Sequence, residues 1–106
     1  MTQMPGFEDW LEICNLKARY CRLLDSKDWD GWAALFTEDC EIDTRPAGGT
    51  LEQGRDAFVA MVRHSLADAR TAHQVHSPEI TFHGDGADVV WAMQDRVVKD
   101  LSLIHI

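Results

Sequence analysis

Residues 18–40, ARYCRLLDSKDWDGWAALFTEDC, decide the fold that we expect for this chain. The stretch begins inside an amphipathic helix predicted for residues 7–25, where apolar side chains recur at intervals of three and four. A tight turn follows, and Ser26 is the predicted N-cap of a second helix that ends near Phe36. The first helix therefore carries Tyr20 among its core residues and ends on a carboxylate, where both side chains could hold or move protons.

Outward from this stretch, the pattern predicts one more helix and several strands. We expect a strand at 40–44, a loop at 45–50, a helix at 56–66 and two paired strands at 70–82 and 87–98. The sequence HGDG at 83–86 is typical of a hairpin turn between the last two. Helices come mostly first and an antiparallel pair comes last, which predicts an α+β fold with helices packed on one face of an antiparallel sheet.

Composition excludes several classes of partner. The chain has 106 residues, enough for one domain, and a formal net charge of -8, which argues against a nucleic-acid or anionic-membrane partner. It has no apolar run long enough to span a bilayer and no signal peptide at its start. Its three cysteines lack metal-type spacing and read as reduced thiols. We therefore expect a cytoplasmic protein.

The end of the chain does not continue the strand pattern. Residues 101–106, LSLIHI, follow VVKD without a turn signal and resemble a translated sequencing adapter. We expect a domain at residues 1–98 that is incomplete at its C-terminus, with a non-native tail at residues 99–106.

The paired strands carry the candidate chemistry. Period-two alternation gives Trp91, Met93 and Asp95 one face, and the apolar part of that face should turn toward the helices. If His73 points the same way, the hairpin sets it against Asp95, since opposed residues on neighbouring strands approach within about 5 Å. Asp25, at the end of the first helix, could then reach the His73 ring from the side.

Such a set is suited to proton transfer at carbon. A neutral imidazole at His73 can accept a proton near pH 7 and return it, and Asp25 would fix its tautomer. The Tyr20 phenol could donate a hydrogen bond to a developing oxyanion. Each residue also has a structural reading: Tyr20 as a core residue, Asp25 as a helix cap, His73 as a satisfied strand histidine, Asp95 as the partner of an arginine. The predicted substrate contacts are Trp29, Trp91, Met93 and His76.

A metal site is not expected. On a regular strand, His73 and His76 point to opposite faces, which makes them a poor chelating pair. The chain also has no glycine-rich phosphate loop and no nucleophile-elbow motif.

The chain resembles the SnoaL-like members of the nuclear transport factor 2 superfamily. The segments that carry the resemblance are LKARYCRLLDSKDWDGWAALFTEDCEID, GRDAFVAMVR, TAHQVHSPEI and VVWAMQDRVV. The resemblance implies a conical, cystatin-like α+β barrel with a pocket inside the cone, from which the last strands are missing here. It also implies that the protein assembles as a homodimer or homotrimer.

Within this superfamily the chain is similar to bile-acid dehydratases and, more distantly, to scytalone dehydratase and ketosteroid isomerase. That similarity implies a pocket tyrosine at Tyr20, a supporting aspartate at Asp25, the acid–base histidine at His73 and a second carboxylate at Asp95. It further implies a lyase or isomerase that needs no metal or cofactor and acts on a hydrophobic cyclic molecule, steroid- or polyketide-like. The alternatives are a non-catalytic ligand-binding or oligomerisation module and an accessory subunit of an oxygenase.

Overall fold

The computed structural model describes residues 6–99 and has three α-helices, a 3-10 turn and two antiparallel strand pairs. In chain order the elements are α1 (Phe7–Asp25), α2 (Trp29–Ala33), β1 (Glu41–Asp43), η1 (Arg45–Ala47), β2 (Leu51–Gln53), α3 (Arg55–Leu66), β3 (Ala69–His83) and β4 (Gly86–Lys99). The expected α+β class is therefore confirmed. Within these residues no helix is both long and apolar enough to cross a membrane.

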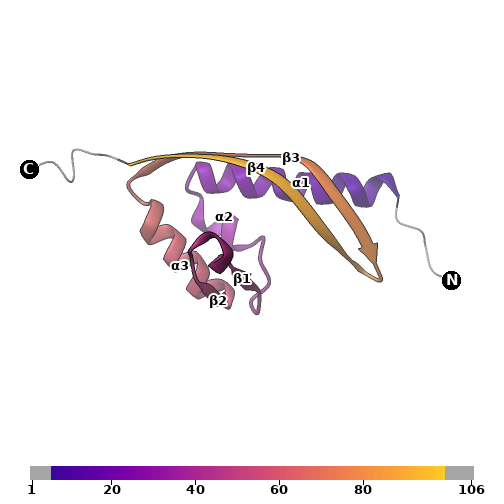
Figure 1. Cartoon of the computed structure of the whole chain (residues 1–106), viewed down its shortest axis with the longest axis horizontal. Helices are drawn as coiled ribbons and strands as arrows, with labels where there is room; N and C mark the ends of the chain where they lie inside the picture. The colour runs from indigo at the N-terminus through magenta and orange to yellow at the C-terminus, as the bar shows by residue number, and fades with distance from the viewer. Residues whose placement is uncertain (1–5, 100–106) are drawn as a thin grey trace, which may run out of the picture.

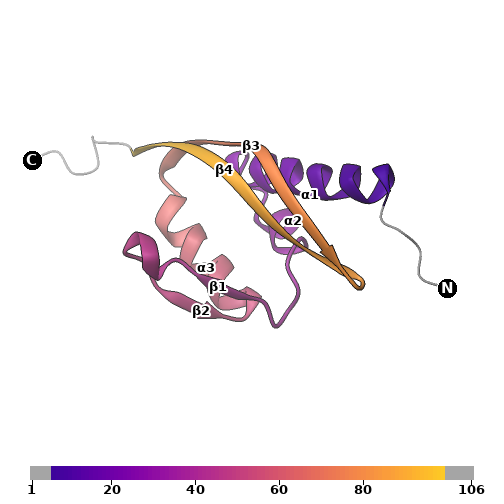
Figure 2. The same cartoon turned by 45° about the vertical axis from the view of Figure 1, so that its right-hand side comes forward.

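The long β3–β4 hairpin and α1 lie against each other, and the remaining elements gather below one end of this pair (Figure 1). Helix α2 packs on both α1 and α3, and α3 contacts β2 and the start of β3 (Figure 2). The helices thus cover part of one face of the hairpin. This arrangement brings the C-terminal end of α1 to the N-terminal half of β3.

The turn between α1 and α2 corrects two details of the prediction. Asp28, not Ser26, caps α2, since its Oδ1 accepts a hydrogen bond of 3.0 Å from the Gly31 N–H. Helix α2 ends at Ala33 and not near Phe36. Past this end the chain makes a tighter, 3-10-type turn, in which the Phe36 N–H donates to the Ala33 carbonyl three residues earlier.

Lys27 fixes this turn to the rest of the fold. Its backbone has φ +60°, the left-handed region that non-glycine residues rarely occupy. Its Nζ donates a hydrogen bond of 2.9 Å to the carbonyl of Ala67, just after α3. The end of α1 is thereby tied to the residue that precedes β3 by two positions.

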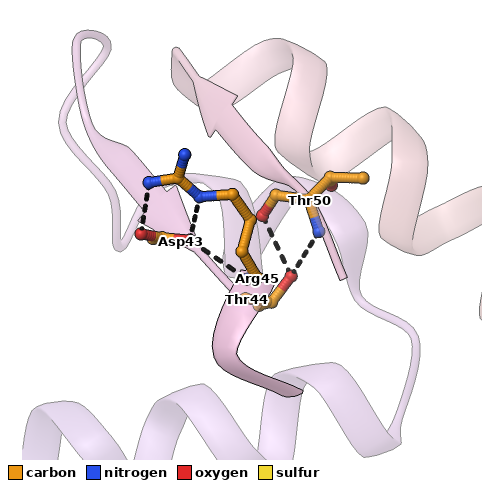
Figure 3. A network of polar contacts seen from close by, with 4 residues as sticks. All are labelled: Asp43, Thr44, Arg45 and Thr50. Carbon is orange, nitrogen blue, oxygen red and sulfur yellow. Dashed lines mark hydrogen bonds and ion pairs between the residues drawn. The ribbon is translucent and has the colours of Figure 1, made fainter. Parts of the chain in front are cut away.

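The β1–β2 pair contains a strand that was not expected, Leu51–Gln53. A polar network closes the connection between its strands (Figure 3). Arg45 donates to the Asp43 carboxylate through Nε and Nη2, at 2.9 Å each, and Thr44 Oγ1 both donates to the Thr50 carbonyl and accepts from its N–H. The sequence pattern missed β2 because Leu51–Gln53 has a single apolar residue and therefore shows no alternation.

The β3–β4 hairpin follows the predicted register. His73 lies directly opposite Asp95, and the two-residue turn Gly84–Asp85 joins the strands. Gly84 has φ +55°, the conformation in which glycine is favoured at the first position of a hairpin turn. The register shifts between His76 and Glu79, where Ser77 has φ +53°. This β-bulge interrupts the regular pairing of β3 with β4 between His76 and Glu79.

The core is small and mostly aromatic. Leu24, Trp32 and Phe58 are its buried centre, and the Trp32 side chain is completely enclosed. The Trp32 ring lies 5.0 Å from that of Phe36 and 5.4 Å from that of Phe58, in the range of favourable aromatic pairs. Leu16, on the predicted apolar face of α1, remains 43% exposed because the hairpin covers only one side of the helix.

Candidate functional site

The carboxylate of Asp25 is the centre of the candidate site. It accepts three hydrogen bonds from β3: 2.8 Å from Thr71 Oγ1, 2.9 Å from the His73 N–H and 2.6 Å from His73 Nδ1. The side chain is 26% exposed. Asp25 therefore does more than end a helix, because it joins the last turn of α1 to the strand that carries the histidine.

The His73 ring is held between two carboxylates. Its Nδ1 meets Asp25, and its Nε2 lies 3.8 Å from Asp95 Oδ2 on the opposed strand. The His73 side chain is only 10% exposed, so the ring is turned inward. The predicted contact of His73 with Asp25, and its placement beside Asp95, are both present in the structure.

The hydrogen bonds of Asp25 determine its charge state. Partial burial by itself would raise the pKa of Asp25, but the bonds from the His73 backbone, the His73 ring and the Thr71 hydroxyl outweigh it, and the pKa lies below its usual value. An ionised carboxylate can only accept, so Nδ1 of His73 carries the proton. In the neutral ring, Nε2 is then left with its lone pair free.

Tyr20 is both a core residue and a neighbour of this set. Its ring packs 5.5 Å from Trp32 and 5.9 Å from Phe36. Burial raises the pKa of Tyr20, and the nearby Cys21 and Asp95 raise it further. The phenol is therefore a protonated hydrogen-bond donor at neutral pH. It shares the electrostatic surroundings of Asp95 but has no described bond to His73.

Two concave regions flank α1. The first, which we name the Tyr20 pocket, has a volume of about 660 Å³ and extends to the hairpin turn. Its lining includes Ile13, Leu16, Lys17, Tyr20, Phe36 and Trp91. The second, the His73 groove, is wider and more open, about 1000 Å³. Its lining includes Cys14, Cys21, Asp25, His73, His76 and Trp91. Tyr20 and His73 thus line different regions, and Trp91 lines both.

The predicted substrate contacts divide into two groups. Trp91 lines both regions, and His76 lines the His73 groove although it lies on the exposed side of β3. Trp29 lines neither, because its ring packs edge-on against Trp32 at 6.1 Å in the core. Met93 shares the face of Asp95, but no described element covers it and it is 59% exposed. The structure thus places neither Trp29 nor Met93 in the two concave regions.

Sequence reasoning missed two residues of the site. Thr71 bonds Asp25, and its position two residues before His73 on the same strand face could have indicated this. Lys17 lines the Tyr20 pocket, and its Nζ lies 3.8 Å from the centroid of the Tyr20 ring. The signal in that case is the spacing of three between the two residues along α1.

The described part of the chain, residues 6–99, has no cluster of three His, Cys, Asp or Glu side chains that could hold a metal ion. What its candidate site offers is a histidine with one nitrogen fixed by a carboxylate, a second carboxylate at the other nitrogen and a protonated phenol nearby. These groups can accept, hold and return one proton.

Comparisons with known proteins support the fold described above. A candidate aromatic ring hydroxylase from Novosphingobium aromaticivorans matches at 27% identity with a TM-score of 0.83, over 92% of this chain and 69% of that one. A candidate scytalone dehydratase from the same species matches at 27% identity and a TM-score of 0.73, over 82% of this chain and 58% of that one.

A third similar structure is a protein of unknown function with a cystatin-like fold from Nostoc punctiforme. It is 20% identical, with a TM-score of 0.74, over 88% of this chain and 69% of that one. None of the curated proteins matches the chain. The family model described as the SnoaL-like domain matches residues 6–102, almost the whole length. The chain therefore belongs to the SnoaL-like domain family, within the nuclear transport factor 2-like superfamily.

Proposed function

We propose that this SnoaL-like protein is a dehydratase or isomerase that uses His73 as its acid–base group on a hydrophobic cyclic small molecule. The observation that carries the proposal is the contact of 2.6 Å between His73 Nδ1 and Asp25, in which a carboxylate behind the ring leaves Nε2 available. The likeness to a candidate scytalone dehydratase at 27% identity supports a dehydratase.

In the proposed reaction, Nε2 of His73 removes a proton from a carbon next to a carbonyl. The imidazolium that forms is stabilised by Asp25 at Nδ1 and by Asp95, 3.8 Å from Nε2. The electron pair of the broken C–H bond moves toward the carbonyl oxygen, to which Tyr20 donates a hydrogen bond. The same proton then returns to a leaving hydroxyl, which departs as water, or to another carbon of the substrate. No cofactor enters this sequence, in agreement with the resemblance described above.

The direct test compares two His–Asp pairs in one protein. His73→Ala removes the proposed base, whereas His83→Ala removes an exposed histidine that pairs with Asp88 at 3.1 Å near the hairpin turn. Turnover of a panel of cyclic β-hydroxy ketones is followed by the absorption of the conjugated enone. We expect kcat/KM to fall by about 100-fold or more for His73→Ala, and to stay within about twofold for His83→Ala. Equal turnover in the two variants would contradict the proposal.

A second candidate function is a ligand-binding module without catalysis. It is favoured by one observation, namely that Tyr20 and His73 line different concave regions. In that case the same ketones bind and quench tryptophan fluorescence, but neither the wild type nor any variant converts them. Binding and turnover measured on one set of samples therefore distinguish the two functions.

A further inference from the structure

The Tyr20 pocket has an apolar wall with one cation on it. Ile13 and Leu16 from α1, Phe36 from the segment after α2 and Trp91 from β4 supply hydrocarbon surface. Among the lining residues that belong to 6–99, Lys17 is the only lysine or arginine. A pocket of about 660 Å³ is in the range of sites for small cyclic molecules.

The ammonium group of Lys17 has little to compensate for its partial burial. Its Nζ lies 3.8 Å from the centroid of the Tyr20 ring, a cation–π contact, and Lys17 forms no ion pair with any carboxylate of residues 6–99. Burial lowers the pKa of Lys17, and the nearby Cys21 and Asp95 act in the opposite direction. An anion that binds next to a half-buried cation of this kind stabilises it.

The acidic side chains of the pocket lie toward its other end. Asp9, Glu12 and Asp85 also line it, and all three are exposed, so solvent screens them. Glu12 precedes Lys17 by five residues, about 7.5 Å along the helix axis, and Asp9 lies further still. An elongated ligand can therefore place its anionic end at Lys17 and keep that end away from these carboxylates.

We propose that Lys17 makes the Tyr20 pocket selective for ring compounds that carry an anionic oxygen group, such as a carboxylate or sulfonate. The inference rests on the proposed function in that it names the substrate class of the pocket that shares Trp91 with the His73 groove. The anionic group would bind the Lys17 ammonium, which lies 3.8 Å from the centroid of the Tyr20 ring. Ring and aliphatic carbons of the ligand would cover Leu16 and Trp91.

The test uses two fluorescent probes that share one ring system. The anionic probe is 1-anilinonaphthalene-8-sulfonate, and the neutral probe is N-phenyl-1-naphthylamine, which lacks the sulfonate. Both are titrated into the wild type, Lys17→Met, Lys17→Arg and, as a matched control, Lys27→Met, which removes a lysine outside the pocket. Far-ultraviolet circular dichroism of each variant verifies that the fold is retained.

We expect the wild type and Lys27→Met to bind the anionic probe about tenfold more tightly than the neutral probe. Lys17→Met abolishes this preference and leaves the Kd of the neutral probe within about twofold, and Lys17→Arg keeps the preference. An unchanged preference in Lys17→Met, an equal weakening of both probes, or a loss of preference in Lys27→Met would overturn the inference. Because probe binding needs no turnover, these outcomes are independent of whether His73→Ala impairs catalysis.

Discussion

Thr71 illustrates how much one hydroxyl contributes to the candidate site. It donates a hydrogen bond of 2.8 Å to Asp25, and this bond helps to hold the Asp25 pKa below its usual value. Without it, the carboxylate would keep its contacts with His73 but would be easier to protonate. The carboxylate that accepts the hydrogen bond from His73 Nδ1 is therefore kept ionised in part by Thr71, whose hydroxyl bonds Asp25 and not the histidine ring.

At this scale we predict that Thr71→Val costs about 1–2 kcal/mol of the free energy of unfolding at pH 7, because Asp25 loses a donor in a partly buried position. Thr71→Ser keeps the hydroxyl and should lose less than half as much. Urea unfolding followed by fluorescence measures both. A loss of equal size in the two variants would show that the methyl group, and not the hydrogen bond, is responsible.

The lowered pKa of Asp25 also predicts a dependence of stability on pH. In the unfolded chain this carboxyl titrates near its usual value of 3.8, and in the folded protein it titrates below that value. Between the two pKa values the unfolded chain binds the proton and the folded protein does not, so acid favours unfolding. The stabilisation by Asp25 is thus fully present above the unfolded pKa and is lost as the pH falls through the folded pKa.

Urea titrations of the wild type and Asp25→Asn from pH 6 to pH 2 should therefore differ in slope. The wild type loses stability more steeply below its unfolded pKa than Asp25→Asn, which has no proton to take up at this position. Parallel curves for the two proteins would contradict the role assigned to the hydrogen bonds of Asp25.

At the scale of elements, the β-bulge of β3 shifts the register of the β3–β4 hairpin between His76 and Glu79. Ser77 has φ +53°, a conformation that a side chain without β-branching tolerates with modest strain. We predict that Ser77→Gly changes the free energy of unfolding by less than about 0.5 kcal/mol, because relief of strain offsets the added freedom of the unfolded chain. Ser77→Val should cost about 1–2 kcal/mol. Thermal unfolding measures both, with Thr81→Val, at an exposed regular strand position, as the control that stays near the wild type.

The elements also show what the sequence could predict. The residue pairing of His73 with Asp95 was predictable because a turn signal at 83–86 and a period of two together fix the register of a hairpin. The contact of His73 with Asp25 followed once the face of β3 was known. Strand β2 was not predictable, since its residues Leu51–Gln53 include one apolar side chain and do not alternate. The separation of Tyr20 from His73 depends on how α1 lies on the hairpin, which no local pattern encodes.

At the scale of the whole molecule, the Tyr20 pocket is lined by residues of both α1 and the β3–β4 hairpin. Phe82, at the end of β3, lines the pocket beside the turn. We predict that Phe82→Ala weakens binding of the neutral probe N-phenyl-1-naphthylamine by about fivefold or more, because the pocket loses a ring that excludes water. The His73–Asp25 pair, far along the hairpin, should be unaffected. A fluorescence titration measures the first effect.

The imidazole resonances of His73 in a ¹H–¹⁵N NMR spectrum provide the control for Phe82→Ala. They should keep their chemical shifts, since neither Thr71 nor Asp25 is moved by the change. Shifted resonances would show that the hairpin turn and the acid–base pair are mechanically coupled, which is contrary to the prediction.

Trp91 stands between the Tyr20 pocket and the His73 groove and lines both. The fluorescence of the Trp91 indole should therefore change when a molecule binds in either the pocket or the groove. A protein in which Trp10, Trp29 and Trp32 are replaced by Phe would leave this single reporter. Quenchers of opposite charge could then identify which compartment a substrate fills, the cation-bearing side or the side of the histidine.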